Sequence, residues 1–219
     1  MKKTTEEIIA ETRVFVQSSL KDAEAGHDWW HIQRVYTTAM ELTHELQANK
    51  LIVALASLLH DVGDAKFHDG DESVGPKIIG EFLKTQNLDF EDYDHIMYII
   101  EHMSFRKSAS FDGDKTIEFQ IVQDADRLDS IGAIGIARAF SFGGYKGRPF
   151  YDPNSLDTEK TENSTYQSGK APTINHFYEK LLLLKDQMNT SAGLKRAQLR
   201  HQYMLGFLEQ FYQEWKGVS

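Results

Sequence analysis

Proline, the residue that most often interrupts helices, is nearly confined to one stretch of this chain. The 219 residues contain four prolines, and three of them, Pro149, Pro153 and Pro172, bracket a single segment. Elsewhere, apolar residues recur every three or four positions, the period of an amphipathic helix, and the sequence shows no convincing pair of strands and no internal repeat. The sequence therefore predicts an all-α fold, with one domain over 1–219 and a core over about 5–215.

The expected helices follow from these periodic stretches and from their end signals. Thr4 and Glu7 form a capping-box pattern ahead of the first helix, which runs to about residue 20. Ser73 is placed to cap the fourth helix, and Gly63 to end the third, which is apolar on every side and is expected to be buried. The ranges expected for the second, third and fifth to ninth helices are about 28–47, 51–59, 91–102, 115–128, 131–140, 174–189 and 193–215.

Residues 141–173 form the longest expected interruption between helices. The segment contains four glycines and the three bracketing prolines, and a loop of this length inside a compact domain is usually functional or mobile. Two interpretations stay open: a disordered surface loop, or a lid over a pocket in which Lys146 and Arg148 meet phosphate groups.

The composition argues against several classes of protein. There is no cysteine, which excludes a disulfide scaffold, thiol catalysis and a zinc site built from thiolates. A metal site in this chain would therefore use imidazole and carboxylate groups. The net charge is −9, and because the sequence shows no basic cluster, we do not expect a nucleic-acid duplex as partner.

Membrane insertion and secretion are also not expected. The longest apolar run, 51–59, has nine residues, whereas a membrane-spanning helix needs about 20. The first seven residues turn acidic before any apolar stretch begins, unlike a secretory signal. We therefore expect a cytoplasmic protein.

Four polar residues occupy positions where the helical pattern expects apolar ones. His31 and Asp126 share helical stripes with apolar residues, and His60 and Asp61 end the apolar third helix. Taken singly, each fits a hydrogen-bonded core residue or a solvated helix end as well as a ligand. Taken together, they direct two imidazoles and two carboxylates inward from three helices, which favours a site for a divalent cation.

The sequence around these residues resembles the H…HD…D signature of the HD-domain superfamily of metal-dependent phosphohydrolases. The similar segments are 27–35 (HDWWHIQRV), 58–64 (LLHDVGD), 124–129 (DADRLD), 132–138 (GAIGIAR) and 174–180 (INHFYEK). The similarity covers about residues 5–215 and points to the small single-domain bacterial branch typified by YpgQ and YedJ. It implies an HD-type helical bundle with the long loop before the last two helices.

The resemblance implies a metal site made by His31, His60, Asp61 and Asp126. Four protein ligands would leave about two positions of an octahedral ion for other ligands. Imidazole and carboxylate groups suit one divalent ion, with Mn²⁺ or Mg²⁺ expected first and Fe²⁺, Co²⁺ or Ni²⁺ as alternatives.

The resemblance also implies roles for residues near these ligands. Asp64 falls where related nucleotidases have a catalytic carboxylate, and Arg34 matches an arginine expected to hold a phosphate oxygen. Lys66, Lys146 and Arg148 are further candidates for binding the phosphate groups of the substrate.

Four other residues are candidates for the surroundings of the metal or for extra ligands: His27, Asp28, His68 and His102. His27 and Asp28 lie at the end of the second helix that is near the metal, and would support the metal ligands through hydrogen bonds. His68 and His102 would complete a second metal site, as in HD-related di-iron oxygenases and two-metal phosphodiesterases.

The function implied by the resemblance is that of a nucleotide pyrophosphohydrolase. Such an enzyme uses metal-bound water to split a nucleoside triphosphate into a monophosphate and pyrophosphate. The alternatives are a nucleotide phosphomonoesterase or phosphodiesterase, a two-metal HD-type oxygenase, and a non-catalytic nucleotide-binding module. A homodimer stays open as well, because the leucine run 181–184 fits either deep burial or a dimer contact.

Overall fold

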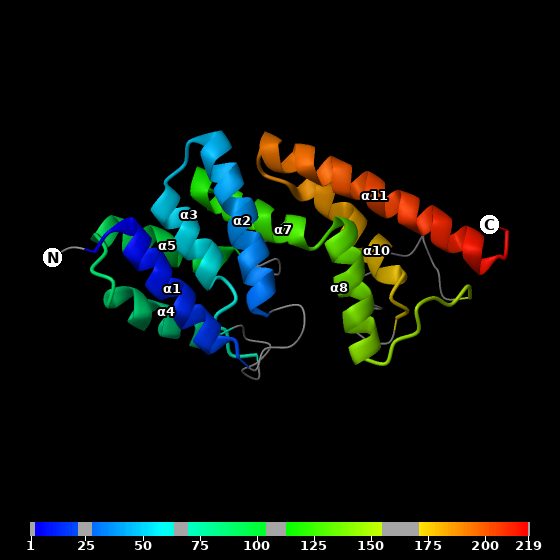
Figure 1. The fold of residues 1–219 in the computed structure, drawn as a ribbon, viewed down its shortest axis with the longest axis horizontal. Helices are drawn as coiled ribbons and strands as arrows, with labels where there is room; N and C mark the ends of the chain where they lie inside the picture. The colour runs from blue at the N-terminus through cyan, green and yellow to red at the C-terminus, as the bar shows by residue number, and fades with distance from the viewer. Residues whose placement is uncertain (1–2, 22–27, 64–69, 104–112, 155–170, 219) are drawn as a thin grey trace. The chain divides into compact units, whose positions relative to one another are not determined.

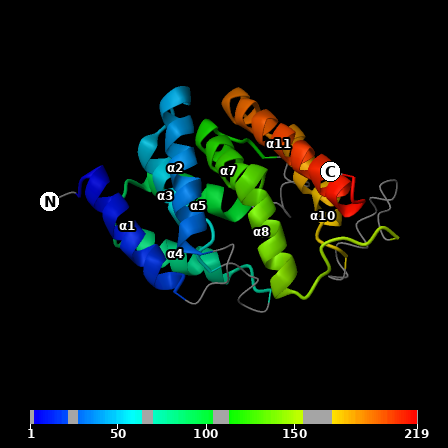
Figure 2. The same cartoon turned by 45° about the vertical axis from the view of Figure 1, so that its right-hand side comes forward.

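The computed structural model describes residues 3–21, 28–63, 70–103, 113–154 and 171–218. Within these ranges every regular element is a helix and no strand occurs, so the predicted all-α fold is confirmed. The chain divides into two compact units, residues 1–126 and 127–219, and the helix α7, Ile117–Asp129, spans the boundary between them. Figure 1 and Figure 2 show the helices of each unit from two directions.

The first unit is built around α3, Lys50–Leu59. This helix packs against α1 (Thr5–Ser19), α2 (Trp29–Leu46) and α5 (Phe90–His102), which together bury its residues from 52 to 59 (Figure 1). A fourth helix, α4 (Val74–Lys84), packs on α5. Because neighbours cover α3 on several sides, a helix that is apolar all round is stable there, as its sequence predicted.

Side-chain caps were predicted at the start of two helices in this unit, and one of the two formed. The Thr4 hydroxyl accepts a hydrogen bond from the Glu7 N–H at 3.2 Å, and the Glu7 carboxylate accepts one from the Thr4 N–H at 2.7 Å. The predicted capping box is therefore confirmed. Ser73 precedes α4, but the prediction that its side chain caps the helix was wrong. Its hydroxyl donates instead to the Asp71 carboxylate at 2.7 Å, a local hydrogen bond that competes with capping.

The second unit contains α8 (Gly132–Tyr145), α10 (Asn175–Glu179), η2 (Leu181–Gln187) and α11 (Ser191–Trp215). The long helix α11 packs against α8 and η2. Aromatic rings from α8, α10, α11 and the segment after α8 form a cluster, and its members include Phe140, Phe177, Phe207, Phe211, Tyr151 and Trp215. Phe177 is the fully buried member of this aromatic cluster, whereas Trp215 at its end is 52% exposed.

The long loop expected over 141–173 begins later than predicted. Helix α8 continues to Tyr145, so residues 141–145 are helical, although they include Gly143 and Gly144. Gly143 is buried against Thr173, whose hydroxyl occupies the space that a Cβ on this glycine would need. A glycine at this position therefore permits close packing inside the helix rather than ending it.

The prediction of a single helix over about 174–189 was also wrong. The structure has the short α10, a break at Lys180, and then η2, which is a 3₁₀-helix. In a 3₁₀-helix every third side chain lies on the same side. Leu181 and Leu184 are accordingly buried, whereas Leu183 is 47% exposed. The run of four leucines therefore buries two members through a helix of period three.

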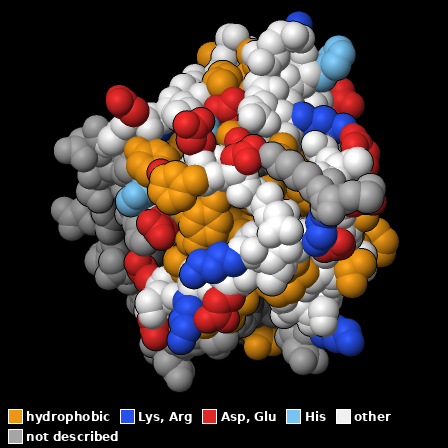
Figure 3. Space-filling model, turned by 90° about the vertical axis from the view of Figure 1, so that its left-hand side faces the viewer, with side chains coloured by type: hydrophobic (Ala, Val, Ile, Leu, Met, Phe, Trp, Pro, Cys, Tyr) orange, Lys and Arg blue, Asp and Glu red, His pale blue; other side chains and the backbone are white. Residues whose placement is uncertain are grey.

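One face of the molecule carries charged side chains of both signs. Figure 3 shows one face on which Lys and Arg side chains lie among Asp and Glu side chains and form no continuous basic patch. Among the helices of the described ranges, none combines the length and the apolar character that crossing a bilayer requires.

Candidate metal centre

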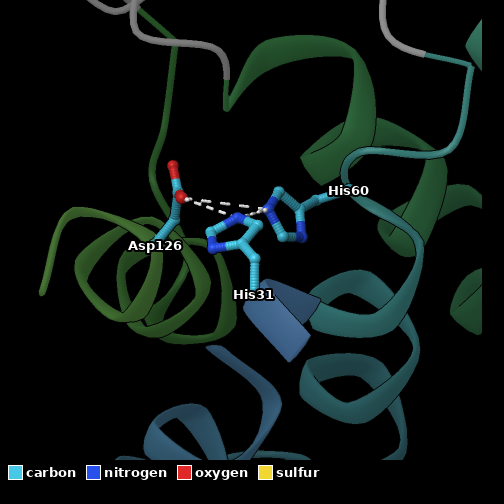
Figure 4. A group of neighbouring side chains, drawn as sticks. All are labelled: His31, His60 and Asp126. Atoms are coloured by element: carbon cyan, nitrogen blue, oxygen red, sulfur yellow. Dashed lines mark hydrogen bonds and ion pairs between the residues drawn. The ribbon is translucent and has the colours of Figure 1, made fainter. Parts of the chain in front are cut away.

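Three side chains from separate helices of the first unit converge on one point. His31 lies in the first turn of α2, His60 directly follows α3, and Asp126 lies in the last turn of α7. His31 Nε2 and His60 Nε2 are 3.2 Å apart, and Asp126 Oδ1 lies 3.6 Å from the first and 3.8 Å from the second (Figure 4). In the part of the chain that the structure describes, these three residues form a group whose donor atoms are close enough to hold one ion.

Asp61 brings a second carboxylate to the same place. Its Oδ2 lies 3.3 Å from His31 Nε2, and its Oδ1 lies 3.6 Å from His60 Nε2. The two imidazoles are almost fully buried, whereas the side chain of Asp126 is 38% exposed. The four residues predicted as ligands therefore lie together, while their coordination of an ion stays a prediction.

The spacing of these donor atoms fits a divalent ion. A hard ion such as Mg²⁺ binds oxygen at about 2.1 Å in octahedral geometry, so two ligands at right angles lie about 3.0 Å apart. Four-coordinate geometry with similar bond lengths gives about 3.4 Å. The distances of 3.2 to 3.8 Å found here lie close to both values, so small movements would let the donors share one ion. The donors are imidazole nitrogen and carboxylate oxygen, a set that suits Mg²⁺, Mn²⁺ and related ions.

The backbone of α3 determines which nitrogen of His60 faces the cluster. His60 Nδ1 lies 2.9 Å from the carbonyl oxygen of Ser57. A carbonyl oxygen only accepts hydrogen bonds, so Nδ1 is the donor in this contact, and Nε2 is the nitrogen that faces the other side chains of the cluster. Metal-ligating histidines are commonly oriented in this way. The sequence analysis missed Ser57, because it contributes a backbone atom; the spacing of three residues to His60 at a helix end was the only signal.

Asp28 holds the backbone that carries His31. It is the N-cap of α2, and its Oδ1 accepts a hydrogen bond from the His31 N–H at 3.0 Å. The sequence placed Asp28 near the metal; the structure shows that its carboxylate stabilises the helical turn from which the imidazole projects. Arg34 follows one turn later on the same helix and is half-buried.

Two titratable side chains outside the cluster have contacts of their own. His102, a candidate ligand for a second metal, is not part of the group formed by His31, His60 and Asp126 among the described residues. Its ring packs edge-on against Tyr98 at a centroid distance of 4.8 Å. Asp129, one turn beyond Asp126, accepts a hydrogen bond from Arg138 Nη1 at 2.6 Å. An ion pair therefore compensates the charge of this buried carboxylate.

The remaining candidates are not placed at the cluster by the structure. Lys146 and Arg148 belong to the second unit, where Lys146 Nζ lies 4.8 Å from the ring centre of Tyr145 and Arg148 Cζ lies 5.4 Å from that of Phe142. Their role in phosphate binding stays a prediction. Four candidates lie outside the described residues: His27, Asp64, Lys66 and His68.

Comparison with known proteins supports the motif analysis. Residues 29–131 match the family model of the HD domain, a range that includes all four candidate ligands. YpgQ of Bacillus subtilis is 38% identical to this chain over 208 residues, which cover 94% of this chain and 93% of YpgQ.

Solved structures show the same similarity in three dimensions. An HD-superfamily hydrolase from Bacillus thuringiensis is 42% identical, with a TM-score of 0.78 and coverage of 97% of this chain and 99% of that one. The structure of Bacillus subtilis YpgQ in complex with ADP has a TM-score of 0.74 at 34% identity, and covers 96% of this chain and 100% of that one.

Proposed function

Because the chain belongs to the HD-domain superfamily of metal-dependent phosphohydrolases, we propose that it is a nucleoside triphosphate pyrophosphohydrolase. The substrate would be an NTP or dNTP, and the products a nucleoside monophosphate and pyrophosphate. The observation that carries the proposal is the convergence of His31, His60 and Asp126 within 3.2 to 3.8 Å of one another. The ADP bound by the similar YpgQ supports a nucleotide as the ligand.

The proposed ligands of one divalent ion, Mn²⁺ or Mg²⁺ first, are His31, His60, Asp61 and Asp126. When bound, such an ion binds phosphate oxygens, lowers the pKa of water and stabilises the negative charge that develops during hydrolysis. The role of the protein is to hold the four donor side chains together before the ion binds. The carbonyl of Ser57 orients one imidazole, and the cap at Asp28 secures the turn that carries the other.

Other residues would bind the substrate and move a proton. Arg34 lies about one turn after His31 in α2. Its planar guanidinium can donate two parallel hydrogen bonds to phosphate oxygens. Asp64, three residues after Asp61, is proposed to take a proton from the attacking water as its oxygen bonds to the α-phosphorus and pyrophosphate leaves. Additional phosphate contacts are assigned to Lys66, Lys146 and Arg148.

The products of the reaction test this proposal against its alternatives. Protein freed of metal with EDTA is incubated with Mn²⁺ or Mg²⁺ and a panel of NTPs and dNTPs in H₂¹⁸O, and the products are identified by ³¹P NMR. We expect pyrophosphate, with ¹⁸O incorporated into the monophosphate. Release of inorganic phosphate from added nucleoside monophosphates would indicate a phosphomonoesterase, and hydrolysis confined to added diester substrates a phosphodiesterase. Absence of both phosphate and pyrophosphate across the panel would contradict the proposal.

Two further measurements address the remaining alternatives. Turnover that requires oxygen, with two ions per chain, would indicate the oxygenase, and thermal stabilisation by nucleotides without turnover would indicate a binding module.

The variant His31→Ala should lose hydrolysis, whereas His44→Ala should retain it. His44 is a matched control because it lies exposed in the last turn of the same helix.

A further inference from the structure

The turn that follows His60 and Asp61 rests on the start of α4 through a contact between two glycine backbones. Gly63 has φ of 69°, in the left-handed region that favours glycine, and Gly75 is buried in the first turn of α4. A Cβ on Gly75 would lie 2.8 Å from the carbonyl oxygen of Val62 and 3.0 Å from that of Gly63. A Cβ on Gly63 would lie 2.7 Å from the Cα of Gly75. Neither position can accept a side chain unless backbone moves.

This contact is only one residue away from a candidate ligand. Val62 directly follows Asp61, is 3% exposed, and donates its N–H to the Leu59 carbonyl at 3.0 Å. The turn is thus tied to the end of α3 by a hydrogen bond and supported by α4 at Gly75. A shift of the turn would pass directly to the Asp61 carboxylate, whose oxygens lie 3.3 and 3.6 Å from the two imidazoles.

Metal binding is sensitive to displacements of this size. Relieving a contact of 2.8 Å to an ordinary separation of about 3.4 Å requires movement of roughly half an ångström. Ligands of a functional site have to be held within about 0.5 Å of their productive geometry. The support that α4 gives to the turn therefore bears on ion affinity as well as on packing.

We propose that Gly75 is a positioning residue of the metal centre. Because it has no side chain, α4 can approach the backbone of Val62 and Gly63 and hold Asp61 beside the two imidazoles. The inference rests on the proposed metal site and adds a residue that binds neither metal nor substrate.

The variant Gly75→Ala tests this role, and Gly80→Ala is its matched control. Both glycines are buried in α4, and both substitutions replace a helical glycine by the same residue. The one tight contact of a Cβ on Gly80 would be with the end of a side chain, the Tyr93 hydroxyl at 3.0 Å, which can move. Three measurements are made on the full chain: the Kd for Mn²⁺ from the electron paramagnetic resonance of free ion, the absorption spectrum of bound Co²⁺, and the thermal unfolding of the metal-free protein.

We expect Gly75→Ala to raise the Kd for Mn²⁺ by about 10- to 100-fold and to change the Co²⁺ spectrum, while Gly80→Ala leaves both as in the wild type. An unchanged Kd and spectrum in Gly75→Ala would overturn the proposal. So would a metal-free Gly75→Ala chain that has lost its fold, because the glycine would then serve folding rather than positioning. A wild-type chain that binds neither ion would instead refute the metal centre itself, so the two failures are distinguishable.

Discussion

Acid is expected to destabilise the second unit through His176, near the start of α10. Burial of the imidazole is the main cause that lowers its pKa to about 4, and the positive charges of Lys180 and Arg148 act in the same direction. The ring is therefore neutral in the folded protein down to about pH 4. In the unfolded chain it takes up a proton below pH 6.5, its ordinary pKa.

The sign and the size of the effect follow from the two pKa values. The unfolded chain binds the proton more readily, so the stability contributed by the neutral ring is complete above pH 6.5 and is lost as the pH falls towards 4. The values differ by about 2.5, which corresponds to about 3 kcal/mol. At pH 4.5 the loss already amounts to about 2.5 kcal/mol of the free energy of unfolding.

Urea denaturation in EDTA, followed by circular dichroism at pH 7.5 and pH 4.5, measures this loss. Between these values the wild type should lose about 2.5 kcal/mol more than His176→Gln, which cannot take up the proton. His44→Gln, which removes an exposed histidine, should behave as the wild type. Lys180→Met should raise the pKa of His176 in the folded protein, and so reduce the loss of stability between pH 7.5 and pH 4.5. Equal losses in the wild type and His176→Gln would refute the reasoning.

Three other substitutions test the site and its support. His60→Ala should abolish both bound metal, measured by elemental analysis, and pyrophosphate release; activity retained in metal-free His60→Ala would leave the metal site without support. Arg34→Lys keeps the charge but loses the planar pair of donors, so we expect KM for the nucleotide to rise about 10-fold with the Kd for Mn²⁺ unchanged. Asp129→Ala removes the carboxylate partner of the half-buried Arg138, and urea denaturation should show a loss of about 3 kcal/mol. Wild-type stability in Asp129→Ala would show that this ion pair contributes little.

Local signals in the chain predicted most of the helices, because their causes lie within a few residues. The capping box of Thr4 and Glu7 and the buried third helix formed as expected. The predictions failed where a contact with another residue outweighed the local signal. Ser73 bonds to Asp71 instead of capping α4, and α8 continues through Gly143, whose missing side chain lets Thr173 pack closely against the helix.

Residue types and the resemblance of the motifs predicted the chemistry of the candidate site. Two histidines and two aspartates stand in apolar surroundings of a chain without cysteine, and that set suits a divalent ion whatever the fold. Their separations of 3.2 to 3.8 Å depend on how α2, α3 and α7 pack together. No pattern within a single helix encodes that packing, since it arises from contacts between residues far apart in the chain.

The supports of the site became visible only in the folded chain. Ser57 orients His60 through a carbonyl oxygen, which every residue possesses, and Gly75 admits the neighbouring turn by lacking a side chain. Neither contribution is marked by the type of residue. Donor identity is a property of individual side chains and can be recognised in a linear sequence, whereas donor orientation and spacing are set by backbone contacts between distant segments, which exist only after the chain has folded.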